Sequence, residues 1–197
     1  MVGERQTLRQ GLYRLAAGQA GFFSAAQALD VGYSYQAQKY HVDHGNWTRV
    51  DRGIFRIPEW PSSVNDSLVR WVLWSKHRAV VSHDSAAAAH GLGVLNPARV
   101  HLTVPPGFRM RNPSVELHRR ELADSDVTLI EGARLTTVLR TVLDVTATQF
   151  DEELIASVVD DAVSSGAVSV RQVERRLEEL NEEAAARGSR VLSRVVA

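Results

Sequence analysis

The sequence predicts an α+β fold, with an N-terminal winged helix-turn-helix followed by a mixed α/β domain that has a small sheet and several helices. Three observations predict it. Apolar residues recur at helical spacing before residue 45, interrupted by glycine-bearing turns. Two β-rich runs then flank a turn at Gly53. Beyond residue 60, β-rich runs and helical segments alternate only loosely, so we expect domains over residues 1–60 and 61–197.

The first helix is predicted over residues 4–17. Leu8, Leu12 and Leu15 recur at intervals of four and three residues, which places them on one helix face. The glycines of residues 18–21 then end the helix, because glycine tolerates the left-handed conformation found at helix C-termini.

Two further short helices follow. Ser24 and Gln27 have the spacing of a capping box, which indicates a helix start at Ser24. Gly32 provides a tight turn, and Ser34 is a favourable N-cap for a third helix over residues 35–44. Two short helices around such a turn predict a helix-turn-helix, whose second helix enters the DNA major groove.

A hairpin is predicted directly after the third helix. Residues 47–50 and 54–57 are rich in β-forming residues, and Gly53 lies in the turn between them. A hairpin at this place is a wing, whose arginines can reach phosphates or a minor groove.

The exposed face of the third helix and the wing form the predicted DNA-binding surface, whereas His41 is expected to pack inward. Glutamine can pair with adenine, and lysine can bind guanine or phosphate. The predicted DNA-binding residues are Ser34, Tyr35, Gln36, Gln38, Lys39, Arg49, Arg52 and Arg56.

The second domain is predicted to contain a small sheet with helices packed against it. Ser82 is expected to cap the helix at residues 83–91. The tryptophans at positions 71 and 74, in the helix at residues 64–78, are expected to belong to the core. The predicted β runs are residues 99–104, 115–118 and 127–131. The predicted helices are residues 64–78, 83–91, 136–147, 151–164 and 169–185, with a last helical piece near Val191.

Nothing in this half carries a recognisable catalytic or cofactor motif. The run Ser82-His83-Asp84-Ser85 has hydrolase residue types, but neighbours on one chain do not normally form a triad, so we interpret it as a cap with a first-turn aspartate. The histidines are scattered, and no phosphate loop, zinc motif or dinucleotide fingerprint is present. We therefore expect no enzyme activity, no cofactor and no metal.

Composition and charge narrow the class of protein. The chain has 44% hydrophobic residues, no cysteine and no net formal charge, so disulfide and thiolate chemistry are excluded. Residues 1–60 carry seven basic and five acidic side chains, residues 61–120 eight and three, and residues 121–197 eight and fifteen. Phosphate binding needs only local positive potential, and the acidic last part is either solvated helix surface or a partner-facing surface. Without a signal segment or an apolar span, we expect a cytoplasmic protein that does not enter a membrane.

Four arginines near the predicted β runs have three possible roles. They extend the DNA-binding face, meet an acidic partner, or are solvated charges that protect a strand edge from aggregation. These residues are Arg109, Arg111, Arg119 and Arg120.

Several segments resemble the AbiEi family, the antitoxins of type IV toxin–antitoxin systems. The most specific is Gly45-Asn46-Trp47-Thr48-Arg49-Val50-Asp51-Arg52-Gly53-Ile54-Phe55-Arg56. The runs at residues 82–92, 100–104 and 132–144 also resemble family segments. Gln38 departs from an apolar residue usual in the family. Longer relatives in actinobacteria carry a further endonuclease-like domain, and this chain ends before such a domain would begin.

The resemblance implies a repressor that is also an antitoxin. Such a protein binds double-stranded DNA at inverted repeats in its own promoter, and its second domain counters a nucleotidyltransferase-like toxin encoded by the adjacent gene. No dimerisation heptads are present, so we expect a monomer on each repeat. Two alternatives remain: a DNA-binding regulator with a ligand-sensing or dimerisation domain, and an enzyme domain that modifies the toxin or acts on nucleic acid.

Overall fold

The computed structural model describes residues 2–63 and 65–195 and divides them into two compact units. The first unit covers residues up to His77 together with Leu129–Ala133, and the second covers Arg78–Thr128 and the chain from Arg134 onward. The division at His77 lies later than the predicted boundary at residue 60, because the helix after the wing belongs with the first unit. None of the described helices is long and apolar enough to cross a membrane.

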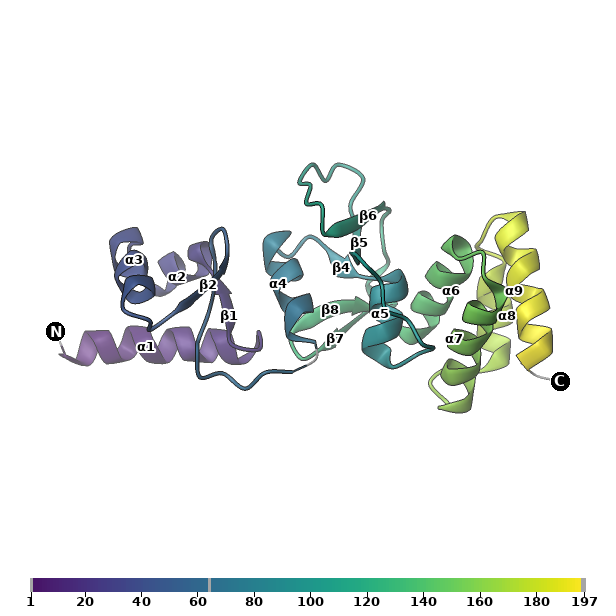
Figure 1. The fold of residues 1–197 in the computed structure, drawn as a ribbon, viewed down its shortest axis with the longest axis horizontal. Coiled ribbons are helices and arrows are strands. Elements are labelled where there is room, and N and C mark those ends of the chain that lie inside the picture. Colours follow the sequence, from purple (N-terminus) through teal and green to yellow (C-terminus); the bar gives the residue numbers. More distant parts are fainter. Residues whose placement is uncertain (1, 64, 196–197) are drawn as a thin grey trace. The chain divides into compact units, whose positions relative to one another are not determined.

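The first unit is a winged helix-turn-helix (Figure 1). Its strands form an antiparallel sheet in the order β1-β3-β2, with Phe23 and Arg49 both opposite Phe55. Strand β1, which sequence analysis did not predict, pairs with the wing. The elements are α1 (Val2–Ala17), β1 (Phe22–Ser24), α2 (Ala25–Val31), α3 (Tyr35–Asp43), β2 (Thr48–Asp51), β3 (Ile54–Arg56) and α4 (Asp66–Trp74).

The core of this unit joins α1, the helix-turn-helix and the wing. Leu12 and Ala16 from α1 pack with Phe23, Trp47 and Phe55. The Phe23 and Trp47 rings meet edge to face, with centroids 4.8 Å apart. The predicted helical face of α1 is therefore confirmed at Leu12, which is fully buried.

The chain from Arg78 onward contains a mixed sheet with strand order β6-β5-β4-β8-β7 and a group of helices, so the predicted α+β class is confirmed. Strands β5 and β6 are parallel, β4 is antiparallel to β5, and β4 is parallel to β8. The elements are β4 (Val80–Val81), α5 (His83–His90), β5 (Val100–Val104), β6 (Val115–Arg119), η1 (Asp124–Asp126), β7 (Val127–Ile130), β8 (Ala133–Thr136), α6 (Val138–Thr148), α7 (Glu152–Ser164), α8 (Val170–Leu177) and α9 (Glu182–Val195).

Helices α6 to α9 pack around a common apolar core, drawn green to yellow in Figure 1. Leu143, Ile155, Val173 and Val191 come from four different helices and are almost fully buried. This packing requires an apolar stripe on each helix.

Two predictions of helix bounds in this unit are wrong. The helix expected from Thr136 instead begins at Val138, capped by Thr137, because Thr136 ends strand β8. The helix expected over residues 169–185 is two helices, α8 and α9. Their apolar stripes meet the common core separately.

Candidate nucleic-acid interface

Local capping signals set the position of α3. The Ser24 side chain accepts from the Gln27 amide while the Gln27 side chain accepts from the Ser24 amide, which confirms the predicted capping box of α2. Gly32 then adopts a positive φ of 116°, a conformation that glycine tolerates readily, and ends α2. Ser34 caps α3 by accepting from the Ala37 amide at 3.2 Å.

The outward face of α3 carries most of the residues predicted to read bases. Ser34, Gln36 and Lys39 are exposed, and Tyr35 is 69% exposed. Lys39 forms an ion pair with Asp43, one turn further along the helix, at 2.5 Å. Because both side chains are well exposed, this pair is weak and leaves Lys39 available to a stronger anionic partner.

Tyr40 belongs to the same face but was missed by sequence analysis. Its side chain is 55% exposed and its ring stacks on His44 at 3.9 Å between centroids. The sequence spacing could have identified Tyr40, because it follows Gln36 by one helical turn and so lies on the same helix face.

The prediction that Gln38 lies on the DNA-reading face is wrong. Gln38 is only 3% exposed, and its side-chain amide donates to the carbonyls of Ala25 and Tyr33 at 3.1 and 3.0 Å. A buried amide can replace an apolar residue only when its polar atoms are satisfied, and two carbonyls near α2 and the turn satisfy its NH₂ group. Gln38 therefore joins α2 to α3 and is not available to DNA.

The prediction that His41 packs inward is confirmed. Its ring stacks on Trp47 at 4.7 Å between centroids and meets Tyr33 edge to face at 5.2 Å. Burial lowers the pKa of His41 below its ordinary value.

The wing presents two arginines to solvent. Arg49 and Arg52 are exposed, and neither guanidinium forms an ion pair within the part of the chain that the structure describes. Gly53 allows the tight turn through its φ of 70°. Asp51 instead pairs with Arg70 at 2.7 Å, and this hydrogen bond lowers the pKa of the Asp51 carboxyl. Arg70 of α4 thus neutralises Asp51, the acidic residue of the wing.

Arg56 lies on the wing as predicted, but its guanidinium is directed into the first unit. It pairs with Asp66 at 2.5 Å and donates to the Pro61 carbonyl at 3.0 Å. It also lies over the Phe22 ring, 5.0 Å from the centroid. Both charged side chains of the ion pair are largely buried. Arg56 therefore joins the wing to α4, and its predicted role as a phosphate contact is not supported.

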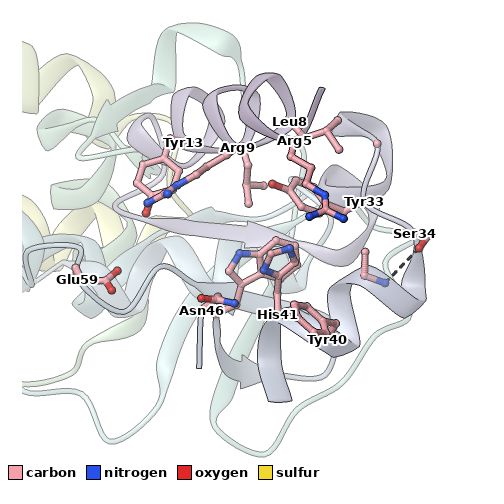
Figure 2. A pocket seen from close by; sticks show the side chains of 14 residues that line it. Arg5, Leu8, Arg9, Tyr13, Tyr33, Ser34, Tyr40, His41, Asn46 and Glu59 are labelled. Carbon is pink, nitrogen blue, oxygen red and sulfur yellow. Dashed lines mark hydrogen bonds between the residues drawn. The ribbon is translucent and has the colours of Figure 1, made fainter. Parts of the chain in front are cut away.

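A groove of about 750 Å³ lies between α1 and α3, on one flank of α3. Figure 2 shows Arg5, Arg9 and Tyr13 on the α1 side and Tyr40 and His41 on the α3 side. A smaller cleft lies on the other flank of α3, lined by Tyr35 and Lys39 of α3 and by Arg49 of the wing. The exposed face of α3 is thus bordered by a groove on each side.

The four arginines singled out in the second unit are all exposed. Arg109 and Arg111 lie in the loop between β5 and β6, Arg119 ends β6, and Arg120 follows it. Arg120 differs from the others, because its guanidinium lies 3.9 Å from the buried carboxylate of Asp144. It balances an internal charge as well as facing solvent.

The second unit gathers three histidines that the sequence left scattered. The rings of His83 and His118 stack at 3.4 Å between centroids, and His118 Nε2 lies 3.2 Å from His101 Nδ1. Burial and the two neighbouring histidines lower the pKa of His83 to about 2, and burial with His101 lowers the pKa of His118 to about 4. Among the described residues, no group of three or more His, Asp or Glu side chains is arranged to hold a metal ion.

Ser82 does not act as the side-chain cap that we predicted. Its hydroxyl is fully buried, accepts from the Thr103 hydroxyl at 2.8 Å, and lies 2.9 Å from His83 Nδ1. The same Nδ1 lies 4.0 Å from Asp144 Oδ2. A hydrolase triad uses one ring nitrogen for the nucleophile and the other for the acid, so this arrangement does not have triad geometry.

Buried ion pairs border the histidines. Arg140 is 4% exposed and binds Asp144 through two nitrogens, while Arg176 binds Asp126 at 3.1 Å. Asp144 Oδ2 has no hydrogen-bond partner among the described residues. Burial raises the pKa of Asp144 although the Arg140 hydrogen bond opposes that shift. Sequence analysis singled out none of these ion pairs, because their partners are brought together by the fold.

Comparison with known proteins defines the fold more than the function. No protein-family model and no curated protein matches the sequence. The chain is similar to the crystal structure of the Rv2827c protein from Mycobacterium tuberculosis, with a TM-score of 0.61 and 15% sequence identity. The match covers 94% of this chain and 77% of that one, so both units take part in the shared fold.

Proposed function

We propose that the protein is a DNA-binding repressor that also acts as the antitoxin of a two-gene type IV system. The observation that supports the DNA-binding part is the exposed polar face of α3 beside the wing, where Arg49 and Arg52 form no ion pair with any residue that the structure describes. Tyr35, Gln36 and Lys39 project from the first turns of α3, the part of a recognition helix that meets base edges.

The chemistry of this face suits a duplex major groove. That groove is about 12 Å wide, which matches the diameter of an α-helix with its side chains. Gln36 can form two hydrogen bonds with one adenine. Lys39 can leave its ion pair with Asp43 and bind a guanine or a phosphate oxygen instead. These contacts would read sequence.

The wing supplies contacts that position the protein without reading bases. Arg49 and Arg52 are free to pair with backbone phosphates, and each neutralised phosphate releases counterions. Affinity should therefore fall steeply with salt. Two copies, one on each half-site, would occupy an inverted repeat, and we propose that each binds as a monomer.

The antitoxin part of the proposal rests on the AbiEi resemblance and on one structural observation. The resembling segments at residues 82–92, 100–104 and 132–144 meet in the second unit, where Thr103 binds Ser82 and Asp144 faces His83. We infer that this unit counters a nucleotidyltransferase-like toxin in the cytoplasm. Helix α7 is acidic, with Glu153, Asp160 and Asp161 exposed, and it is the surface that we assign to a basic partner.

The enzymatic alternative has less physical support. Ser82 is fully buried, and its neighbour His83 approaches it and Asp144 with the same nitrogen. A regulator without antitoxin activity is distinguished by toxin rescue. Co-expression of this protein with the toxin of the adjacent gene should restore growth, and persistent growth arrest would remove the antitoxin part.

DNA binding is tested with the full chain and a labelled duplex from upstream of its gene, by fluorescence anisotropy. Gln36→Ala and Lys39→Ala should each weaken binding about 5- to 150-fold, the range expected for one lost base contact. Gln10→Ala and Arg14→Ala are matched controls, because they remove the same kinds of exposed side chain from α1. Equal affinities for all four variants would refute the assigned face.

A further inference from the structure

The groove between α1 and α3 has the properties of a small-molecule site rather than of a simple surface depression. Its volume of about 750 Å³ falls within the range typical of ligand pockets. It is built entirely from the first unit, and Leu8, Leu12 and Ala37 provide apolar parts of its lining.

Aromatic rings form much of its wall. Tyr33 meets Trp47 edge to face at 5.0 Å between centroids, and His41 stacks on Trp47 at 4.7 Å. Tyr13 and Tyr40 stand at the two sides, on α1 and α3 (Figure 2). Such a set of rings favours a flat, unsaturated ligand, because offset stacking and edge contacts both stabilise it.

The charges of the groove favour an anion. Arg5 and Arg9 lie one turn apart on α1 and are both exposed, whereas Glu59 is the acidic residue among the lining residues. Arg9 lies over the Tyr13 ring, 5.4 Å from its centroid, which holds its guanidinium at the groove. Guanidinium groups bind carboxylates and phosphates in a bidentate manner, through two parallel hydrogen bonds.

A polar atom in the wall lacks a partner. His41 Nδ1 is buried and has no hydrogen bond among the described residues, although His41 lines the groove. Because this atom is buried even in the open groove, an occupant would reach it only after the His41 ring moves, so the rings and the arginines carry the proposal.

We propose that this groove binds a planar aromatic ring that bears a carboxylate or a phosphate. The ring lies among Tyr33, Tyr40 and Trp47, and the anionic group pairs with Arg5 and Arg9. Aromatic carboxylates and mononucleotides share this chemistry, and binding experiments separate them.

The position of the groove suggests what the ligand would regulate. Ser34, the N-cap of α3, and Ala37 and Tyr40 within α3 all line the groove, so an occupant contacts the flank of the recognition helix. A bound ligand would therefore change the affinity for DNA, and by linkage DNA would change the affinity for the ligand by the same factor. This consequence rests on the proposed function, whereas ligand binding itself does not.

Isothermal titration calorimetry on the full chain tests the site. Salicylate represents aromatic carboxylates and adenosine monophosphate represents nucleotides. Benzylamine supplies a ring without an anion, and inorganic phosphate an anion without a ring. We expect saturable binding of at least one aromatic anion at about 1 mM or below, and at least tenfold weaker binding of both controls.

Variants assign the binding to the groove. Arg5→Ala and Arg9→Ala should each weaken binding about tenfold, as loss of a charge-assisted hydrogen bond would, and Tyr40→Ala should weaken it as well. Gln10→Ala, on the same helix but outside the lining, should leave it unchanged. Unaltered far-ultraviolet circular dichroism verifies that each variant is folded.

Two results would overturn the proposal. One is the absence of binding heat for both aromatic anions up to about 5 mM, a concentration at which even a millimolar ligand is bound. The other is binding that neither arginine variant weakens. Failure of DNA binding with intact ligand binding would refute the proposed function alone.

Discussion

Acid should destabilise the second unit through its histidines. Because burial lowers the pKa of His83 to about 2 and that of His118 to about 4, both rings stay neutral in the folded protein at pH 5. In the unfolded chain they titrate near 6.5 and are protonated at pH 5. The unfolded state then binds more protons, so stability is complete above about pH 6.5 and is lost as the pH falls.

The magnitude follows from these values. One proton difference changes the free energy of unfolding by about 1.4 kcal/mol per pH unit, so the two histidines together contribute about 2.7 kcal/mol per unit near pH 5. Between neutral pH and pH 5 the accumulated loss is about 4 kcal/mol. Burial also lowers the pKa of His101, which adds to the loss of stability. Burial raises the pKa of Asp144, which opposes that loss. Domains of this size are stable by only about 5–15 kcal/mol.

The assay separates the two units by their chromophores. All four tryptophans, at positions 47, 60, 71 and 74, belong to the first unit. Tryptophan fluorescence therefore follows that unit, and a change in far-ultraviolet circular dichroism without a fluorescence change follows the second. Urea titrations from pH 7 to pH 5 then give the free energy of unfolding of each unit at each pH.

A matched pair of variants tests the assignment. His118→Gln should reduce the pH slope of the second unit by about 1.4 kcal/mol per unit, since one titrating ring is lost. His44→Gln, an exposed histidine of the first unit, should leave that slope unchanged. The reasoning fails if the second unit is equally stable at pH 7 and pH 5, or if His118→Gln retains the full slope.

Three further predictions concern the first unit. Gln38→Ala should lower the free energy of unfolding of this unit by about 2–4 kcal/mol in tryptophan-monitored urea titrations, because two carbonyls lose their partner. Gln36→Ala should change it by less than about 0.5 kcal/mol. Similar losses in both variants would contradict the inward placement of Gln38. Arg56→Ala should cost about 3 kcal/mol by the same measurement, since it leaves the Asp66 carboxylate buried and unpaired, and an unchanged midpoint would argue against that ion pair. Arg52→Ala should weaken binding to all duplexes alike and reduce the salt slope by about one, and a loss confined to one sequence would indicate base reading instead.

Sequence analysis predicted those parts of the fold that local signals define. The caps at Ser24 and Ser34 and the glycine turn at Gly32 act over a few residues, and each is present in the structure. Strand β1 escaped prediction because it has three residues and is stabilised by β3, thirty residues away. Such a pairing leaves little pattern in the strand itself.

The candidate site was predicted less completely, for similar reasons. Gln38 is polar and lies on a short helix, so its inward direction depends on carbonyls at Ala25 and Tyr33 that no periodicity reveals. The histidine cluster depends on the parallel pairing of β5 with β6, which sets Thr103 opposite His118. That register is a tertiary property and cannot be derived from the spacing of the histidines.

The proposed insertion of α3 into the major groove is tested most directly by photocrosslinking from single positions of the full chain. A photoreactive side chain at position 36, in place of Gln36, should crosslink to the bases of the upstream duplex. The same group at position 10 on α1 should not. Equal crosslinking from both positions, or crosslinking from position 10 alone, would contradict the assignment of α3 as the recognition helix.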